Sequence, residues 1–187
     1  MARPIRRVIT GHRPDGRSTV LADDPAPNVK QRAAGNASTL LWVTEECPAE
    51  VSGASDRAAR DIGVPPPRRG SVFRIAEFPP QTGGEVRDNE TVLRDFGIGA
   101  DVARGHPPRH PAIHRTRTID YVIVLEGEID LLLDEGEVRL CAGDVVVQRG
   151  TNHAWINRGK AVCRLGMVFI DAQEPSEIAA LNTATGR

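Results

Sequence analysis

Residues 119–157, with the sequence IDYVIVLEGEIDLLLDEGEVRLCAGDVVVQRGTNHAWIN, decide the fold of this chain. Short apolar runs of strand length alternate there with glycine-containing turns such as Glu126-Gly127-Glu128 and Asp134-Glu135-Gly136. Strands that recur about every 8–12 residues, joined by such turns, predict an antiparallel barrel or jelly roll. The predicted strands are Ile119–Leu125, Ile129–Leu133, Val138–Leu140, Val145–Gln148, His153–Asn157 and, beyond the quoted stretch, Ala161–Ile170.

The flanking segments extend this all-β pattern. Before the stretch, strand-like runs lie at Arg6–Thr10, Ser18–Ala22, Thr39–Thr44 and Ser71–Phe78, and Pro79–Asn89 is rich in turn residues. After it, Glu174–Leu181 is the best helix candidate, because Pro175 is tolerated in a first helical turn. We therefore predict one domain over residues 1–187, with a strand-rich N-terminal extension and first barrel strands (1–105), a barrel core (106–172), and a short helix and tail (173–187).

The composition excludes several classes of function. The 24 basic and 25 acidic residues nearly cancel, so the chain lacks the positive excess that a nucleic-acid binder needs. No run approaches the roughly 20 apolar residues of a membrane helix, and no apolar run of a secretory signal follows the first arginines. Cys47, Cys141 and Cys163 are too widely spaced for a disulfide framework or a cysteine zinc site. We expect a cytoplasmic protein with no nucleic-acid or membrane partner.

Two short segments carry residues suited to chemistry. His114 and Asp120 have the same strand parity, so a regular strand would place both on one face. Asp120 is the only ionisable residue of its apolar strand, and its burial is costly without a cation or hydrogen bonds. His153 opens another strand, which antiparallel pairing can bring beside His114. Two imidazoles and a carboxylate are a ligand set for iron, zinc or manganese. Alternatively, Asp120 accepts hydrogen bonds from the protein, and His153 is a packed histidine next to Trp155.

The stretch from His114 onward resembles the cupin superfamily, whose small β-barrels carry two signature motifs. The first motif is G-x5-H-x-H-x3-4-E-x6-G. Counting back from Gly127 places Asp120 at the glutamate position, and His114 and Thr116 at the two histidine positions. The first histidine is thus present, the second is a threonine, and the glutamate is shortened to aspartate.

The second motif, G-x5-P-x-G-x2-H-x3-N, follows in the expected order. It is matched by Gly143, Gly150, His153 and Asn157, with Gln148 at the proline position and a first gap one residue short. The resemblance implies an all-β fold: a cupin jelly-roll β-barrel (double-stranded β-helix) with the strand-rich N-terminal extension and a short C-terminal helix.

Cupins with the full motifs bind iron, manganese, nickel or zinc through three histidines and the glutamate. The resemblance therefore implies a divalent metal ion (Zn, Fe, Mn or Ni) held by His114, Asp120 and His153. A threonine hydroxyl is a poor ligand, but Thr116 can orient a bound water. Asp120 and Thr116 are accordingly the predicted catalytic residues.

Further side chains are expected near this site. His106 and His110, just upstream, are possible extra ligands, although prolines make their segment irregular. Strand parity directs Arg115 and Arg117 away from His114, so both are predicted to be solvated. The predicted pocket wall consists of Trp155, Asn157, Val122 and Val124.

Three functions are compatible with these residues. The first is a metal-dependent enzyme acting on a small organic acid or carbonyl compound in a non-redox reaction, as a decarboxylase, dehydratase, isomerase or cyclase. The second is a metal-free barrel that binds or senses a small molecule, which the loss of a histidine at Thr116 favours. The third is an iron-dependent dioxygenase with a two-histidine, one-carboxylate site. The N-terminal strands would protect sheet edges or be exchanged in a homodimer, which the resemblance implies.

Overall fold

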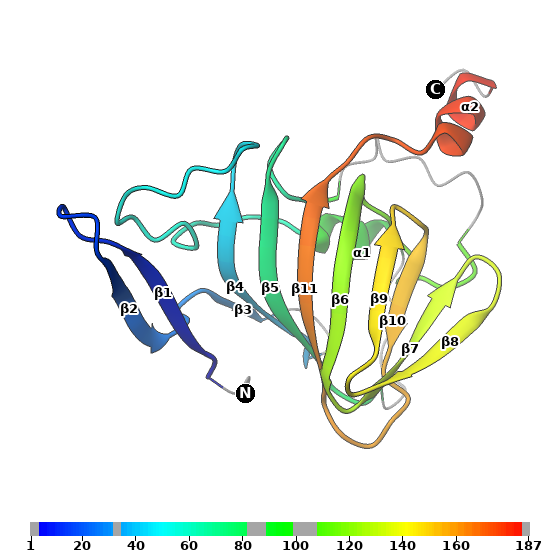
Figure 1. Ribbon diagram of the computed structural model, residues 1–187. Coiled ribbons are helices and arrows are strands. Elements are labelled where there is room, and N and C mark those ends of the chain that lie inside the picture. Colours follow the sequence, from blue (N-terminus) through cyan, green and yellow to red (C-terminus); the bar gives the residue numbers. More distant parts are fainter. Residues whose placement is uncertain (1–3, 32–34, 82–88, 99–107, 185–187) are drawn as a thin grey trace.

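The computed structural model describes residues 4–31, 35–81, 89–98 and 108–184, and strands dominate these ranges (Figure 1). The strands are β1 (Arg6–His12), β2 (Ser18–Pro25), β3 (Val29–Gln31), β4 (Ala37–Thr44), β5 (Ser71–Phe78), β6 (Thr118–Glu126), β7 (Glu128–Leu133), β8 (Glu137–Cys141), β9 (Val145–Arg149), β10 (His153–Ile156) and β11 (Cys163–Asp171). The helices are α1 (Asn89–Phe96) and α2 (Ser176–Ala184). The predicted all-β jelly roll is confirmed.

The main sheet contains six antiparallel strands in the order β3-β4-β5-β11-β6-β9. Strand β6 shows how its two faces differ. Thr118, Asp120, Val122 and Val124 are buried on the inner face, and the residues between them are exposed. Because side chains alternate across a strand, this register carries Asp120 into the interior of the barrel.

A second antiparallel sheet, in the order β10-β7-β8, closes the barrel against the main sheet. Leu131 of β7, Leu140 of β8 and Trp155 of β10 pack in one core with Val122 of β6 and Leu165 of β11. Each large apolar side chain buried in this way contributes about 1.5–3 kcal/mol to folding. The core therefore joins the two sheets and holds the inner face of β6 in place.

The β6–β7 turn, which leads from one sheet to the other, depends on a glycine. Gly127 has a φ of 79°, in the left-handed region that side chains with a Cβ disfavour. A Cβ at this position would also lie 2.8 Å from the carbonyl oxygen of Val162. The glycine of the first motif is thus required by backbone geometry.

Strands β1 and β2 form a hairpin that stands apart at the left edge of the main sheet in Figure 1. Arg7 anchors it: its Nη1 and Nη2 donate to the Asp56 carboxylate at 2.9 and 2.7 Å, and Nη1 also donates to the carbonyl oxygen of Leu41 at 3.1 Å. Arg7 is only 8% exposed, so this is a shielded, bidentate ion pair. The strand-rich N-terminal extension is confirmed, with β3 and β4 in the main sheet and β1–β2 outside it.

Helix α1 begins at the end of a segment that the turn residues led us to predict as irregular. It ends in a Schellman motif: the Gly97 N–H donates to the Arg94 carbonyl oxygen, the Ile98 N–H donates to that of Leu93, and Gly97 has a φ of 67°. Helix α2 confirms the predicted C-terminal helix. Among the described residues, no helix is long and apolar enough to cross a membrane.

Candidate functional site

The structure brings together the two histidines that the motifs pair. The backbones of His114 and His153 form an isolated antiparallel bridge, in which each N–H donates to the other's carbonyl oxygen at 2.9 Å. The two ring centroids are 4.4 Å apart, and Phe96 of α1 meets the His114 ring at 4.8 Å between centroids. Both histidines are buried. Helix α1 therefore packs against the His114 side of the histidine pair.

Backbone carbonyl groups orient both imidazole rings. Nδ1 of His114 lies 2.9 Å from the carbonyl oxygen of Ala112, and Nδ1 of His153 lies 3.0 Å from that of Thr151. These contacts assign a proton to each Nδ1. Burial, together with the neighbouring His114, lowers the pKa of His153 well below its usual range, so its ring is neutral at pH 7.

Asp120 is a carboxyl group in the interior of the barrel. Its side chain is 2% exposed, and its Oδ1 has no hydrogen-bond partner among the described residues. Burial raises the pKa of the Asp120 carboxyl to about 7, although a hydrogen bond with Thr118 opposes the rise. The Thr118 hydroxyl also lies 2.6 Å from that of Thr116. A carboxyl group with this pKa exchanges a proton readily near neutral pH.

Gln148 lies directly opposite Asp120 in the β6–β9 register. It is 3% exposed, and neither Oε1 nor Nε2 of its amide has a partner in the described part of the chain. Nε1 of Trp155 also lacks a hydrogen-bond partner among the described residues. Trp155 lies on the same face of β10 as His153. Buried polar atoms are normally hydrogen-bonded, so this group of unpartnered atoms indicates a place for a polar ligand or for water. The sequence signal for Gln148 was a polar side chain at an inward position of a valine-rich strand.

The three predicted metal ligands do not form one set. Within the described ranges, no three His, Cys, Asp or Glu side chains lie close enough together to hold a metal ion, so Asp120 does not complete a site with His114 and His153. His110 accepts a hydrogen bond at Nδ1 from the Ala112 N–H at 3.1 Å, and His106 lies outside the described residues. Protein sites for zinc and related ions use at least three protein donors. The described donors therefore do not fit the metal of a full cupin motif.

Among the residues of the predicted pocket wall, Asn157 has a different place from the other three. Val122, Val124 and Trp155 do lie inside the barrel, in the main core. Asn157, however, is fully buried and is engaged at every polar atom of its side chain: Nδ2 donates to the carbonyl oxygens of Phe78 and Ala161 at 2.7 and 2.8 Å, and Oδ1 accepts from the Gly159 N–H at 2.8 Å. It fastens the β10–β11 loop to the end of β5.

The solvated position predicted for Arg115 is wrong, whereas the one predicted for Arg117 is confirmed. Arg115 is 1% exposed, forms an ion pair with Glu174 and donates from Nη1 to the carbonyl oxygen of Gly150 at 3.3 Å. The side chain of Arg117 is 54% exposed. Strand parity misled the prediction because regular pairing of β6 begins only at Thr118, so Arg115 belongs to an irregular segment.

The jelly roll with its two motif segments defines the class of protein. The model of the cupin domain family, Cupin_2, matches residues 102–170. The chain belongs to the cupin superfamily.

Two curated relatives align with most of this chain. It is 33% identical over 177 residues to the "Cupin-domain-containing oxidoreductase srdD" of Neurospora crassa, covering 92% of this chain and 78% of that protein. It is 36% identical over 143 residues to the "Phomopsin biosynthesis cluster protein D" of Diaporthe leptostromiformis, covering 73% of this chain and 71% of that protein. Among solved structures, the cupin domain of Schizosaccharomyces pombe Cnp3 aligns over 97% of this chain and 93% of that chain, with 13% identity and a TM-score of 0.45.

Proposed function

We propose that this cupin is an enzyme that acts on a small organic acid or carbonyl compound inside the barrel by a non-redox proton transfer. The observation that carries the proposal is the pair of buried side chains Asp120 and Gln148, which are cross-strand neighbours on the inner face of β6 and β9 and have unpartnered polar atoms among the described residues. A substrate with a carbonyl or hydroxyl group would satisfy these atoms, and it would recover the desolvation cost that they carry in the free protein.

The residues suggest a division of roles. Asp120 moves the proton, since a carboxyl group with a pKa of about 7 is populated in both protonation states near neutral pH. The Gln148 amide offers both a donor and an acceptor to orient the substrate, and Trp155 adds an indole N–H. Proton transfer next to a carbonyl group is the step shared by isomerases, dehydratases and cyclases. The role predicted for Thr116 stays a prediction.

The names of the relatives support an enzyme in the biosynthesis of small specialised metabolites. One is named for a phomopsin biosynthesis cluster and another is named an oxidoreductase. The second name favours a redox enzyme as a second candidate, and the histidine pair, in which the neutral His153 has its Nε2 as an acceptor, is the feature of this chain that would serve it. A barrel that binds or senses a small molecule without turning it over is the remaining alternative.

Metal analysis separates the candidates. We expect the full chain, purified without a histidine tag, to hold zinc, iron, manganese or nickel well below one ion per chain, because the described donors include only a pair of adjacent imidazoles. Elemental analysis of the wild type, of His153→Ala and of His12→Ala, an exposed histidine on the hairpin, measures this. A full equivalent of iron that only His153→Ala removes would favour the oxidoreductase instead.

Proton transfer is tested directly by deuterium incorporation from D2O. A panel of small β-keto acids and α,β-unsaturated aldehydes is incubated with the enzyme, and exchange at carbon is followed by proton NMR. We expect Asp120→Asn to slow exchange by about 10²–10⁴-fold, the usual contribution of a general acid–base group. Gln148→Ala should raise KM more than it lowers kcat.

The matched control is Glu126→Gln, which makes the same acid-to-amide change on the exposed end of the same strand. Exchange that Asp120→Asn leaves unchanged would contradict the proposal. Saturable binding of a panel compound with no exchange above buffer would favour the binding protein.

A further inference from the structure

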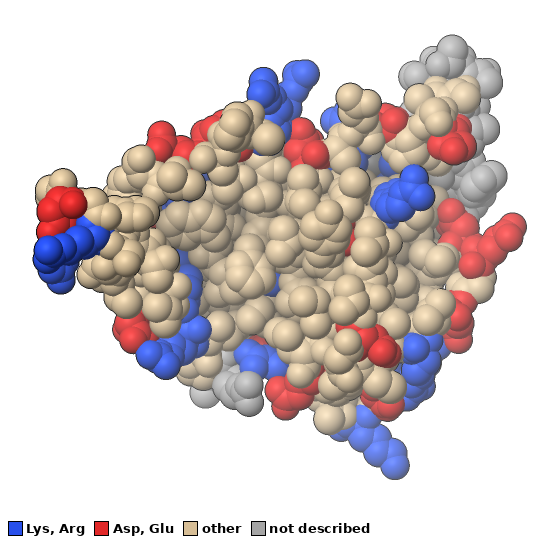
Figure 2. All heavy atoms as spheres, viewed as in Figure 1, with Lys and Arg blue, Asp and Glu red and all other residues tan. Residues whose placement is uncertain are grey.

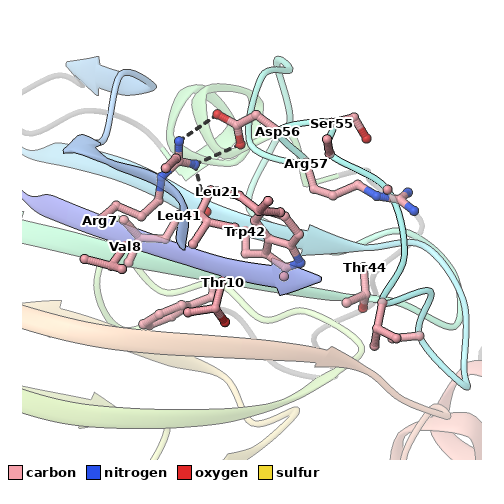
Figure 3. Close-up of a pocket in the computed structure, with 18 of the residues that line it drawn as sticks. Arg7, Val8, Thr10, Leu21, Leu41, Trp42, Thr44, Ser55, Asp56 and Arg57 are labelled. Atoms are coloured by element: carbon pink, nitrogen blue, oxygen red, sulfur yellow. Dashed lines mark hydrogen bonds and ion pairs between the residues drawn. The ribbon is translucent and has the colours of Figure 1, made fainter. Parts of the chain in front are cut away.

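A groove lies outside the barrel, between the β1–β2 hairpin and the outer face of the main sheet (Figure 3). It has a volume of about 960 Å³, within the range of about 300–1,000 Å³ that is typical of small-molecule sites. The hairpin, strands β4 and β5, and the loop residues 49–57 line it. Its floor includes Phe73 of β5, whose neighbour Val72 points into the barrel core. The groove and the barrel interior therefore lie on opposite faces of the sheet.

A β-bulge in β4 shapes the floor of the groove. The register between β4 and β5 shifts between Leu40 and Trp42, so Leu41 is an extra residue without a paired residue on β5. Leu40 and Val43 both pack in the barrel core, whereas Leu41 and Trp42 between them both line the groove. In a regular strand Trp42 would point into the barrel and Val43 out of it. The bulge therefore turns the indole ring of Trp42 into the groove.

The shifted register also places a second aromatic ring beside Trp42. Phe73, which is 42% exposed, lies directly opposite Trp42 on β5. Cross-strand neighbours on one face have Cβ atoms about 4.5–5.5 Å apart, so the two rings form one aromatic floor. The hairpin adds the half-exposed side chains of Val8 and Leu21 as a wall. Walls of this kind suit a flat, apolar ligand.

The arginine and carboxylate charges that line the groove cancel one another. They belong to three arginines and three acidic residues: Arg6, Arg7, Arg57, Asp24, Glu50 and Asp56. Each of these arginines already has an ion pair within the chain, at 2.7 Å for Arg6–Asp23 and Arg7–Asp56 and at 3.1 Å for Arg57–Glu45. Figure 2 shows that the charged residues on this side of the molecule lie mostly toward its edges. An anionic ligand would have to compete with an existing ion pair, so an uncharged ligand matches this lining best.

Arg7 holds the walls of the groove together. Its guanidinium group donates to the Asp56 carboxylate, as the dashed lines in Figure 3 show, and to the carbonyl oxygen of Leu41. One buried side chain thereby joins the hairpin, the loop residues 49–57 and the bulge of β4. Because these contacts form the groove without a ligand, binding requires little further ordering of the protein.

We propose that the groove is a second binding site, separate from the barrel interior, for a small uncharged aromatic compound that stacks on Trp42 and Phe73. The proposal goes beyond the proposed function, because it assigns a ligand to the outer face of the sheet. The hydroxyl groups of Thr10 and Ser55 in the lining can form hydrogen bonds with a hydroxyl or carbonyl group of such a compound without adding charge.

Isothermal titration calorimetry of the full chain with 2-naphthol, an aromatic alcohol that is uncharged at pH 7, tests the proposal. We expect one molecule to bind per chain, with a Kd below about 1 mM. The anion 2-naphthoate and the cation 2-naphthylmethylammonium carry the same ring system, and each should bind at least about 10-fold more weakly. Heats that do not saturate, or equal affinity for a charged ring, overturn the proposal.

Two variants locate the bound ring. Trp42→Ala should weaken 2-naphthol binding about 10-fold, because it removes half of the aromatic floor. Val8→Asp puts a charge into the hairpin wall and should weaken binding by a similar factor. Val8 is 48% exposed, so Val8→Asp keeps the test decisive if Trp42→Ala unfolds.

The matched control is Tyr121→Ala. It removes an aromatic ring that is 48% exposed on β6, on the same face of the sheet but outside the groove, and should leave the Kd unchanged. Binding that a folded Trp42→Ala or Val8→Asp leaves unchanged, or that Tyr121→Ala weakens equally, overturns the assigned site.

Two further titrations address other places and other occupants. Gln148→Ala changes the barrel interior and should leave 2-naphthol binding unchanged, whereas a loss of binding would place the probe in the barrel and overturn the proposal. If a second copy of the chain covered the groove, the apparent Kd would rise with protein concentration. We expect the same Kd at about 20 µM and about 200 µM chain, and a rise overturns the proposal.

Discussion

Replacing Asp120 by asparagine is expected to make the protein more stable at pH 8, by up to about 4 kcal/mol in the free energy of unfolding. The reason is that burial raises the pKa of this carboxyl from 3.8 to about 7, and each unit of pKa corresponds to about 1.4 kcal/mol. Asparagine has nearly the same shape and carries no charge, so the variant avoids the cost of an ionised carboxylate in the barrel.

The stability difference between Asp120→Asn and the wild type should depend on pH. Below about pH 4 the carboxyl is protonated in both the folded and the unfolded chain, and the variant gains nothing. Between about pH 4 and pH 7 the unfolded chain releases the proton while the folded chain keeps it, so wild-type stability falls as the pH rises. Above pH 7 the penalty is complete. The gain in the variant should therefore grow from near zero at pH 4 to a plateau above pH 7.

Chemical denaturation of the wild type and Asp120→Asn at a series of pH values measures this gain. Glu126→Gln, the same acid-to-amide change at the exposed end of the same strand, is the control variant in this series. A constant difference between Asp120→Asn and the wild type from pH 4 to pH 8 would show that Asp120 does not titrate in this window. We expect Asp120→Asn to be more stable than the wild type and also slower in deuterium incorporation into the substrate. This combination indicates a residue that is kept for function at a cost in folding stability.

Replacing Asn157 by alanine is expected to lower the free energy of unfolding by about 3 kcal/mol. The side chain makes three hydrogen bonds, to the backbone at Phe78, Ala161 and Gly159, and each is worth about 1 kcal/mol. The loop between β10 and β11 would lose its attachment to the end of β5. Thermal and chemical unfolding measure the loss.

Asn157→Asp tests the part played by the two donated hydrogen bonds. It keeps the acceptor for the Gly159 N–H but turns a carboxyl oxygen toward the carbonyl oxygens of Phe78 and Ala161, so at pH 8 the expected loss of stability is at least as large as in Asn157→Ala. If Asn157→Ala instead left stability unchanged and abolished ligand binding, Asn157 would be the pocket residue that the motif suggested.

The barrel strands were predictable because their signal is local. From β6 to β11, apolar runs stop at glycine-containing turns, and Gly127 and Gly143 occupy backbone conformations with positive φ that favour this residue. Helix α1 was not predictable in this way. It has only eight residues, too few to be stable alone, and it depends on its Schellman ending and on the contact of Phe96 with His114.

The residues of the candidate site were likewise predictable only where the signal is local in the sequence. Motif spacing identified His114, Asp120 and His153, and strand parity placed Asp120 inside the barrel. Spacing did not foresee Gln148 as the polar cross-strand neighbour of Asp120, because that position depends on the β6–β9 register. Nor did it foresee that Arg115 is buried against Glu174. The two residues are 59 positions apart in the sequence, so only the tertiary fold brings them together.

By itself, then, the sequence determined the class of fold, the strand order along the chain and the motif positions His114, Asp120 and His153, since alternation, turn residues and motif spacing are properties of neighbours in the chain. Only the tertiary structure decided which of those residues meet. It paired His114 with His153, kept Asp120 out of a shared ligand set, and left apolar side chains of β6 facing solvent on the outer face of the main sheet. The physical reason is that contact between strands depends on register and sheet closure, which the packing of the whole core sets.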